Sequence, residues 1–496
     1  IDNKGYTLNF SGEFSSPVEG SLNFIDSSVA QNGTTILSGQ STFTKKLIAQ
    51  STRFTNAGTI ILNNSTILEN DNPFTNTGTI KIDESSISNK STFINSGEIT
   101  NNDRFYNFET LRLEANSKFT GTGSLNLSGS TVIFNGPGIQ FNNNIAINPD
   151  FVNSLGVTLF VADGVTQNID NVISSPNGSA PLTKDGLGKL ILNGANTTFS
   201  GQTTLSLGAL QVGHNAALGT NSLKMLNNTT LQFGIGGLVI NNPVVLDSGN
   251  SVNPGIATID TGNFMSTLSN AITQIGNSVM KLIIQGGNIL TLNGLISHQG
   301  GSEVGAGTTF KAGISNIFAG VNKSLKLAGV ASTFDMTAAD QILGELQSSI
   351  STSQVLLNNR TLTINQPSIF DVVFSGFGGC IIAKADLTLG GQSTNTGLFT
   401  IDASVNPVTM TMKVNSSLAA GSSFSLIGLG ANNAVFDMKL ASQTISELNG
   451  NAHSLIELGN QKLTFGTNND SVFKGEIQGT NVSSLVKKGN GTANFE

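Results

Sequence analysis

Glycines around a lysine are the first residues whose types and spacing could do chemistry. Gly186, Gly188 and Gly194 lie in LTKDGLGKLILNGANTTFSGQTTLSLGALQVG, and glycine-rich loops can hold phosphate with backbone N–H groups. A phosphate loop needs Gly-x-x-x-x-Gly-Lys followed by Ser or Thr, at the start of a helix. Here Lys189 is followed by Leu190, and alternating apolar residues continue as in a strand. The stretch therefore does not fit a phosphate site.

The glycine pattern is instead a repeat. The same spacing of 0, 2 and 8 recurs at Gly121, Gly123 and Gly129, at Gly305, Gly307 and Gly313, and begins again at Gly489 and Gly491. A motif that opens a strand several times along the chain is typical of a module in a repetitive fold.

Histidine and cysteine are the other residue types that could act as bases, nucleophiles or metal ligands. His214, His298 and His453 each lie near glycine or a turn-forming residue, and we expect them to be exposed turn residues. A Ser-His-Asp triad stays open, because its members need only meet in space. Cys380 is the single cysteine, so no intramolecular disulfide can form, the zinc motifs are excluded, and we expect a small strand residue.

Acidic residues give no convincing pair for glycoside hydrolysis, which needs two carboxylates facing one sugar bond. Glu69 and Asp71 are two apart and are expected on one strand face, whereas the adjacent Asp83 and Glu84 are expected on opposite sides. A solvated surface explains them. Gly300-Gly301 is followed by Ser-Glu and does not fit the calcium-binding nonapeptide. We predict no catalytic, cofactor-binding or metal-binding residue.

The composition favours strands that present an uncharged polar surface. Only 11% of the 496 residues are charged, 57 are glycine, and Asn, Ser and Thr supply most of the polarity. The net charge is −7 and there is no basic cluster, which excludes nucleic acid as a partner. No cofactor is indicated, and no apolar stretch is long enough to span a bilayer as a helix.

A phenylalanine repeat indicates the architecture. Phe54, Phe74, Phe93, Phe105 and Phe119 are each followed by apolar residues with a period of two, usually after a glycine four positions on. An interval of about 20 residues is typical of solenoid coils and suits a right-handed parallel β-helix. The predicted fold is therefore an elongated all-β solenoid with loop insertions. Phe54, Phe74, Phe93 and Phe119 should stack at equivalent positions, asparagines should form ladders, and the glycines should supply turns with positive φ.

A longer duplication connects two segments near the carboxyl end. Phe334-Asp335-Met336, Leu362 and Phe370 recur as Phe436-Asp437-Met438, Leu463 and Phe473, at offsets of 102, 101 and 103. Residues 337–350 alone could be an amphipathic helix, but their counterpart, residues 439–452, is rich in β-branched residues and glycine. Both segments are therefore predicted to be strand–turn–strand.

The stretch from Leu182 to Gly213 resembles the passenger-associated repeat of bacterial autotransporters, L-T-K-x-G-x-G-T-L-x-L-x-G-x-N-T-Y-x-G-x-T. Phe199 replaces the usual Tyr, and Lys189 stands where Thr is common. Residues 214–234 and 443–492 are similar to that family. The low-charge, Asn-rich composition resembles that of large rickettsial-type surface antigens. The expected domains are residues 1–130, with Phe-x-Asn-x-Gly coils, and residues 131–496, with Gly-x-Gly repeats that continue beyond 496.

This resemblance implies a β-helical passenger of a type V secreted virulence protein, exported by a C-terminal outer-membrane β-barrel in the full-length protein. The expected location is extracellular, at the cell surface or outer membrane of a Gram-negative bacterium. The expected function is a non-enzymatic adhesin or surface-layer fibre, with a host-cell surface receptor or neighbouring copies of itself as partner. Autotransporter proteases carry Gly-Asp-Ser-Gly, which is missing here. A carbohydrate-active β-helix enzyme, lyase or hydrolase, and a phage or viral fibre are the alternatives.

Overall fold

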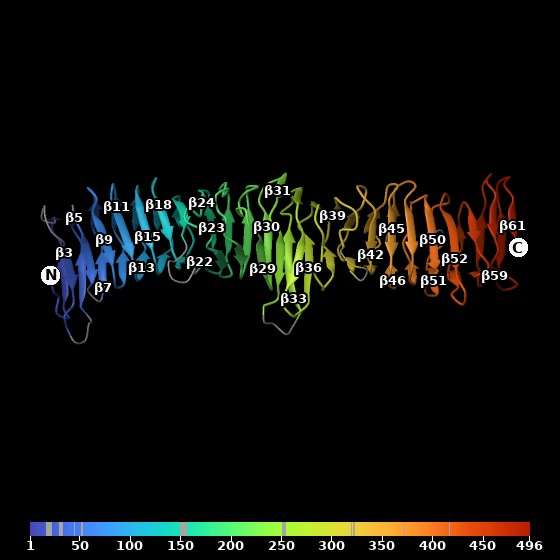
Figure 1. The fold of residues 1–496 in the computed structure, drawn as a ribbon, viewed down its shortest axis with the longest axis horizontal. Helices are drawn as coiled ribbons and strands as arrows, with labels where there is room; N and C mark the ends of the chain where they lie inside the picture. Colours follow the sequence, from blue (N-terminus) through green and yellow to red (C-terminus); the bar gives the residue numbers. More distant parts are fainter. Residues whose placement is uncertain are drawn as a thin grey trace. The chain divides into compact units, whose positions relative to one another are not determined.

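The computed structural model describes residues 1–15, 22–28, 33–43, 45–50, 53–148, 156–249, 254–318, 320, 323–371, 373–415 and 417–496. Within these ranges every regular element is a β-strand and none is a helix. The strands of each unit pair in parallel and lie side by side in successive coils (Figure 1). The predicted all-β parallel solenoid is confirmed.

The chain divides into two compact units. Unit 1 comprises Ile1–Ile235 and Asn241–Val245, and unit 2 comprises Gly236–Ile240 and Leu246–Glu496. The boundary falls within β32 (Val244–Asp247). The predicted change of repeat type after residue 130 concerns sequence families and stays a prediction.

Unit 1 has three faces, and most coils contribute one strand to each, although the last coils have no strand on face three. Face one contains β1 (Thr7–Phe10), β4 (Thr34–Leu37), β7 (Arg53–Asn56), β10 (Phe74–Asn76), β13 (Thr92–Asn95), β16 (Thr110–Leu113), β19 (Thr131–Phe134), β22 (Val157–Val161), β25 (Leu182–Asp185), β27 (Thr203–Leu205) and β29 (Leu223–Leu226). Face two contains β2 (Phe14–Ser15), β5 (Gln40–Phe43), β8 (Thr59–Leu62), β11 (Thr79–Ile82), β14 (Glu98–Asn101), β17 (Lys118–Thr120) and β20 (Gln140–Phe141), then β23 (Thr166–Ile169), β26 (Lys189–Leu192), β28 (Ala209–Val212) and β30 (Thr229–Phe233). Face three contains β3 (Leu22–Ile25), β6 (Leu47–Gln50), β9 (Ile67–Asn70), β12 (Ser86–Asn89), β15 (Arg104–Asn107), β18 (Ser124–Leu127), β21 (Asn144–Ile147) and β24 (Ile173–Ser174).

Unit 2 is built in the same way. Face four contains β33 (Gly255–Asp260), β36 (Met280–Gln285), β38 (Ser302–Val304), β40 (Leu325–Leu327), β43 (Leu346–Ser348), β46 (Ser368–Phe370), β49 (Leu387–Leu389), β51 (Val408–Met412), β53 (Ala434–Asp437), β56 (Ser454–Glu457) and β59 (Glu476–Gln478). Face five contains β31 (Leu238–Ile240), β34 (Ser266–Leu268), β37 (Ile289–Leu292), β39 (Thr309–Ala312), β41 (Thr333–Asp335), β44 (Gln354–Leu356) and β47 (Val373–Ser375), and β54 (Gln443–Thr444), β57 (Lys462–Phe465) and β60 (Ser484–Lys487) take the same place in later coils. Face six contains β42 (Gln341–Leu343), β45 (Thr361–Ile364), β48 (Cys380–Ala383), β50 (Leu398–Ala403), β52 (Ser423–Gly428), β55 (Leu448–Gly450), β58 (Ser471–Phe473) and β61 (Ala493–Phe495). A further strand is β35 (Ile272–Ile275). Its Ile272 forms a parallel bridge with Ile296, which in turn forms one with Phe318.

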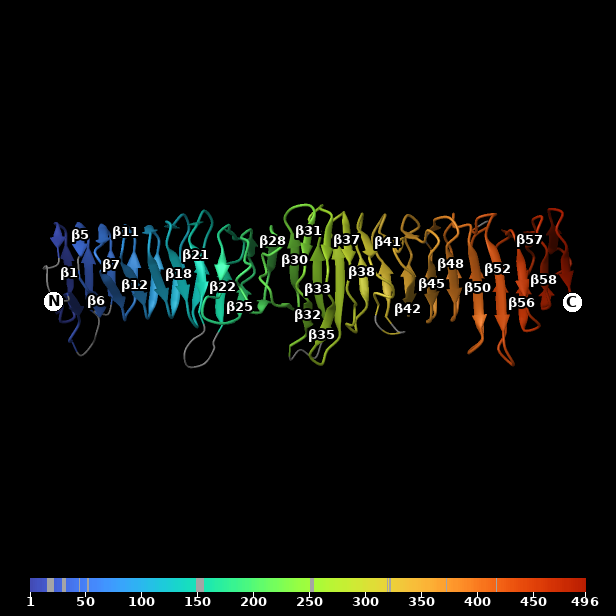
Figure 2. The same cartoon turned by 45° about the horizontal axis from the view of Figure 1, so that its top comes forward.

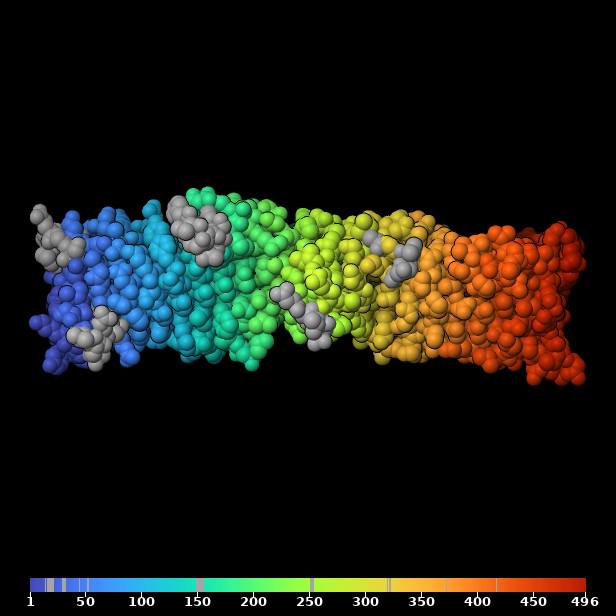
Figure 3. All heavy atoms as spheres, turned by 60° about the horizontal axis from the view of Figure 1, so that its bottom comes forward, coloured from blue at the N-terminus to red at the C-terminus, as the bar shows by residue number. Residues whose placement is uncertain are grey.

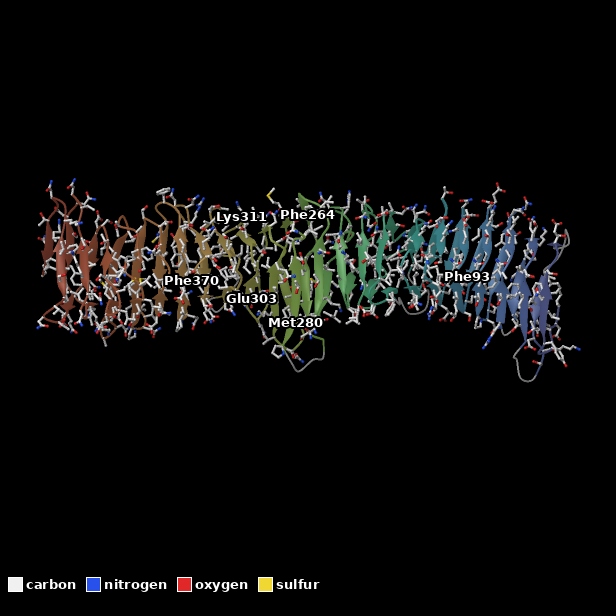
Figure 4. All side chains as sticks on the ribbon, turned by 180° about the vertical axis from the view of Figure 1, so that it is seen from behind. Phe93, Phe264, Met280, Glu303, Lys311 and Phe370 are labelled. Carbon is white, nitrogen blue, oxygen red and sulfur yellow. The ribbon has the colours of Figure 1, made fainter. Side chains whose placement is uncertain are left out.

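Stacked phenylalanines form the core of face one. Phe54, Phe74 and Phe93 are paired in register on successive strands, with ring centroids 4.9 Å and 4.7 Å apart. All three are buried, and Figure 4 labels Phe93 within the ribbon. The predicted stacking of these three residues is confirmed.

The prediction that Phe119 continues this stack is wrong. Phe119 lies on β17 of face two, where it pairs with Ile99. The interval from Phe93 to Phe119 exceeds the interval from Phe74 to Phe93 by one strand and its turn, which moves Phe119 to the next face. Phe105 on face three connects the two rings by edge contacts, at centroid distances of 5.4 Å and 5.3 Å. The aromatic column is therefore continuous but changes face.

The glycines after these phenylalanines are required by close packing, not by positive φ as predicted. Gly58, Gly78 and Gly97 lie at the corner between faces one and two and do not have φ in the left-handed region. A Cβ on each would lie 2.1, 2.0 and 2.1 Å from the carbonyl oxygen of the corner glycine one coil before. That oxygen accepts a hydrogen bond from the following coil, as from Thr79 N to Gly58 O at 2.8 Å. No side chain fits between the two backbones.

Asparagine ladders lie inside the same coils, as predicted. Asn56 Nδ2 donates to Asn76 Oδ1, and Asn76 Nδ2 donates to Asn95 Oδ1, both at 2.7 Å. A second ladder on face three joins Asn70, Asn89 and Asn107 at 2.6 Å and 2.5 Å. Each side-chain amide thus donates a hydrogen bond to the next amide oxygen in its ladder, which offsets the cost of burying these polar groups.

The two duplicated segments are strand–turn–strand, as predicted. Residues 337–350 contain β42 and β43, and residues 439–452 contain β54 and β55. Their turns also agree, because Asp335 Oδ1 accepts from Thr337 N at 2.9 Å and Asp437 Oδ1 accepts from Lys439 N at 3.0 Å.

The duplicated segments nevertheless occupy different faces. Phe334, Leu362 and Phe370 lie on faces five, six and four, whereas their counterparts Phe436, Leu463 and Phe473 lie on faces four, five and six. The second copy is therefore shifted by one face. The same apolar and polar alternation serves every face, since each has one buried and one solvated side.

We predict that Gly78→Ala will destabilise unit 1 by about 3 kcal/mol or more, the upper end for overpacking, because the new Cβ meets a backbone oxygen. Gly12→Ala is the control, since a Cβ there has no neighbour within 4 Å. Urea unfolding followed by circular dichroism measures both. Equal stability of the two variants would contradict the corner argument.

We predict that Phe74→Ala will cost about 3–5 kcal/mol and that the loss will stay in the neighbouring coils, because repeats contact only their neighbours. Hydrogen exchange should show lost protection around β7, β10 and β13 and unchanged protection in unit 2. Phe377→Ala is the control, since Phe377 is 80% exposed. Equal loss of protection near residue 450 would contradict a one-dimensional stack.

Candidate functional site

The three histidines do not come together, and one is not where it was predicted. His214 is exposed and His453 is half-buried, but His298 is buried, so the prediction of an exposed turn residue is wrong for it. His298 Nδ1 lies 2.9 Å from Met280 O and Nε2 lies 3.2 Å from Ser302 Oγ. The carbonyl can only accept, so Nδ1 carries the proton and Nε2 accepts from the hydroxyl. The ring therefore joins two neighbouring coils of unit 2.

Burial lowers the pKa of His298 to about 4, and nearby Lys323 acts in the same direction. Lys323 Nζ donates to His298 O at 2.6 Å. The imidazole is consequently neutral at physiological pH, and its two nitrogens are used in packing. Its Nε2 does contact the Ser302 hydroxyl, but its Nδ1 is bonded to the backbone carbonyl of Met280 and not to a carboxylate, so His298 is not part of a Ser-His-Asp triad.

Lys184, the lysine of the Leu-Thr-Lys motif, is also part of the core. It is 1% exposed, and its Nζ donates to Gly186 O at 2.6 Å and to Leu207 O at 2.9 Å. Burial lowers the pKa of Lys184 to about 8. The amine supplies donors to carbonyls of two successive corners, a structural role that the sequence pattern did not reveal.

Glu69 and Asp71 of unit 1 lie on a solvated surface, as expected. Glu69 pairs with Lys46 at 2.7 Å and Lys90 at 3.6 Å, and Lys90 also lies 3.9 Å from Asp71. Such exposed pairs contribute about 0–1 kcal/mol each. These carboxylates are held by lysines of neighbouring coils.

The prediction that Asp83 and Glu84 lie on opposite sides of a strand is wrong. Both are exposed in the turn between β11 and β12. Asn102 Nδ2 donates to Asp83 Oδ1 at 2.7 Å, and Glu84 has φ of 46°. Turn geometry, and not strand alternation, sets their directions.

Cys380 is the first residue of β48, as expected for a strand residue. Burial raises the pKa of the Cys380 thiol, which makes it a weaker nucleophile at neutral pH. No group of three or more potential metal ligands occurs in the part of the chain that the structure describes.

The outer surface of face one carries a regular row of threonines. Six lie in register on successive strands: Thr92, Thr110, Thr131, Thr158, Thr183 and Thr204. All are half-buried, with the side chain directed away from the core. The row repeats every coil, so this surface presents the same hydroxyl and methyl groups at each step.

A hollow of about 450 Å³ interrupts the surface of face four in unit 2. Its floor is a row of outward residues in register on successive strands: Lys326, Gln347, Ile369 and Thr388. Glu345, Pro367 and Asp386, which precede β43, β46 and β49, form one side. A second hollow of about 530 Å³ shares Glu345 and Pro367. Figure 3 shows the side chains of successive coils covering the core, coloured by residue number.

Turn lengths explain where the hollow lies. The connections from face six to face four are short here: residues 344–345, 365–367 and 384–386. Farther along, β50 and β52 are longer strands of six residues each, and turns 404–407 and 429–433 follow them. Figure 2 shows these strands reaching beyond their neighbours. Sequence periodicity carried no signal for this arrangement, because the hollow arises from differences between turns.

No family model matches the chain, and no solved structure matches it. Over 152 residues it is 32% identical to the Adhesin BmaC autotransporter of Brucella suis biovar 1 (strain 1330), a match that covers 29% of this chain. The chain resembles an autotransporter passenger domain. The match covers 4% of that much longer protein. Among the described residues, no helix is long and apolar enough to cross a membrane.

We predict that acid will destabilise unit 2 through His298. Its pKa is about 4 in the fold and about 6.5 in an unfolded chain. Between these values the unfolded state binds the proton and the folded state does not, so stability falls as the pH drops through this window, by up to about 3 kcal/mol. Urea unfolding of wild type and His298→Asn at pH 7 and pH 4.5 should show the wild-type advantage shrinking at pH 4.5.

The control for this prediction is His214→Asn, which alters an exposed ring whose Nδ1 only accepts from Ala216 N. It should leave the pH dependence of stability unchanged. A His298→Asn variant with the same pH dependence as wild type would show that His298 is not the responsible group.

Proposed function

We propose that the chain is a non-catalytic, adhesin-like passenger displayed outside the outer membrane of a Gram-negative bacterium. The observation that carries this proposal is the similarity to part of a protein named as an autotransporter adhesin. The parallel solenoid supports it, because stacked coils present long outer faces suited to extended contact. The resemblance also supports export by a C-terminal outer-membrane barrel in the full-length protein.

The chemistry of the described residues is consistent with display rather than turnover. The two buried titratable side chains that stand out, Lys184 and His298, are hydrogen-bonded within the core. The carboxylates Glu69 and Asp71 are paired with lysine. The outer surfaces instead offer repeated hydroxyl groups, as on face one, and the hollow on face four. A host-cell surface or a neighbouring copy of the chain is the proposed partner.

Adhesion of beads coated with residues 1–496 tests this function. Coated beads should attach to cultured epithelial cells, or aggregate with one another, more than beads that carry the same chain after chemical unfolding. Attachment to cells supports a host receptor, and bead aggregation supports self-association. Coated beads that do neither would overturn the adhesin proposal.

A further inference from the structure

We propose that the hollow on face four of unit 2 binds a neutral oligosaccharide along the stacking direction of the coils. This inference rests on the proposed function and gives that function a site and a ligand class. The hollow spans the strands β40, β43, β46 and β49. Three steps of about 4.8 Å between strands give a length of about 14 Å. An extended ligand that follows the floor therefore meets one new side chain at each coil.

The first argument is the charge of the hollow. Lys326 forms no ion pair within the described residues. By contrast, Lys281 on β36 of the same face pairs with Glu303, which Figure 4 labels, and Lys413, just after β51, lies 3.2 Å from Asp371. Glu345 and Asp386 likewise pair with no lysine or arginine in that part of the chain. The hollow thus holds both signs of charge without mutual neutralisation.

This charge pattern selects against charged ligands of either sign. An anionic polymer would lie against the carboxylates of Glu345 and Asp386, and a cationic one against Lys326. A hydroxyl group can donate to a carboxylate and accept from an ammonium group. A ligand that carries many hydroxyls and no charge can therefore satisfy all three groups, whereas burying any of them unpaired would be costly.

The second argument is the positioning of the polar groups. Asp386 Oδ1 accepts from Thr409 N at 2.8 Å, which holds the carboxylate and leaves Oδ2 for a ligand. Gln347 Nε2 donates to Glu345 Oε1, so these two side chains fix one another. Held side chains lose little freedom when a ligand binds, which favours affinity.

The third argument is the exposed apolar surface at the centre of the floor. Ile369 is 57% exposed, and Pro367 lies beside it. Phe370, which follows Ile369 in β46 and is labelled in Figure 4, is buried in the core and anchors the strand. A sugar ring has a polar rim and an apolar C–H face. It can cover Ile369 while its hydroxyls reach the charged groups around it.

The test is isothermal titration of residues 1–496 with cellotetraose, maltotetraose and tetra-N-acetylchitotetraose. At least one of these neutral probes should bind with Kd near 1 mM or tighter, about −4 kcal/mol. Ile369→Ser should weaken binding at least tenfold, and Asp386→Asn should weaken it severalfold while Oδ1 still accepts from Thr409. Val405→Ser is the matched control, because Val405 is 75% exposed outside the hollow. Its affinity should equal that of wild type.

Failure of all three neutral probes would overturn the inference. So would equal affinity in wild type and Ile369→Ser, with circular dichroism confirming that the variant is folded. Binding of only an anionic probe, heparin, or a cationic one, chitosan tetramer, would also overturn it. Chromatography of the probe after incubation with the protein shows whether the sugar chain has been cleaved. Together with the bead assay, it distinguishes failure of this inference from failure of the proposed function. A shortened probe would overturn the non-catalytic role, whereas failed titrations beside adhesive beads would overturn the sugar site alone.

Discussion

The close approach of backbones at the corner between faces one and two is the constraint on which the phenylalanine-repeat coils of unit 1 depend. At Gly78 the carbonyl oxygen of Gly58 occupies the place of a Cβ, and the same relation joins Gly97 to Gly78. At these corners only glycine allows one turn to lie directly on the one before, whereas the corner at residues 114–117 contains no glycine. Once the corners coincide, the strands that leave them are in register, and every coil places chemically similar residues over one another.

Register then decides what can be buried. Phe54, Phe74 and Phe93 stack ring on ring, and Asn56 donates to Asn76 one coil on. An isolated buried amide would be costly, but in a ladder each amide finds a partner that is identical to itself. The exceptions lie at the start of each ladder, where Asn56 Oδ1 and Asn70 Oδ1 have no partner. A buried amide is thus best satisfied in the interior of a run of like coils.

The sequence alone was sufficient for the all-β parallel solenoid, because the strand period of two and the regular coil interval are both visible in it. It placed Phe54, Phe74 and Phe93 correctly but not Phe119, since a difference of one strand and turn moves a residue to the next face. His298 was misplaced because glycine neighbours occur at tight buried corners as well as in exposed turns. The hollow at Ile369 could not be predicted, since it depends on turns from several coils that meet only in space.

The shift of the duplicated segment by one face affects how such a chain can change its length. Recombination between the matching stretches at Phe334 and Phe436 would remove or add the whole segment between them without breaking the local Asp turn that both share. Every strand beyond the junction would then move to the adjacent face. The core would tolerate this where all faces bury the same kind of residue, but the surface would be rotated. A single genetic event could therefore redirect the outward groups of all later coils while the fold persisted.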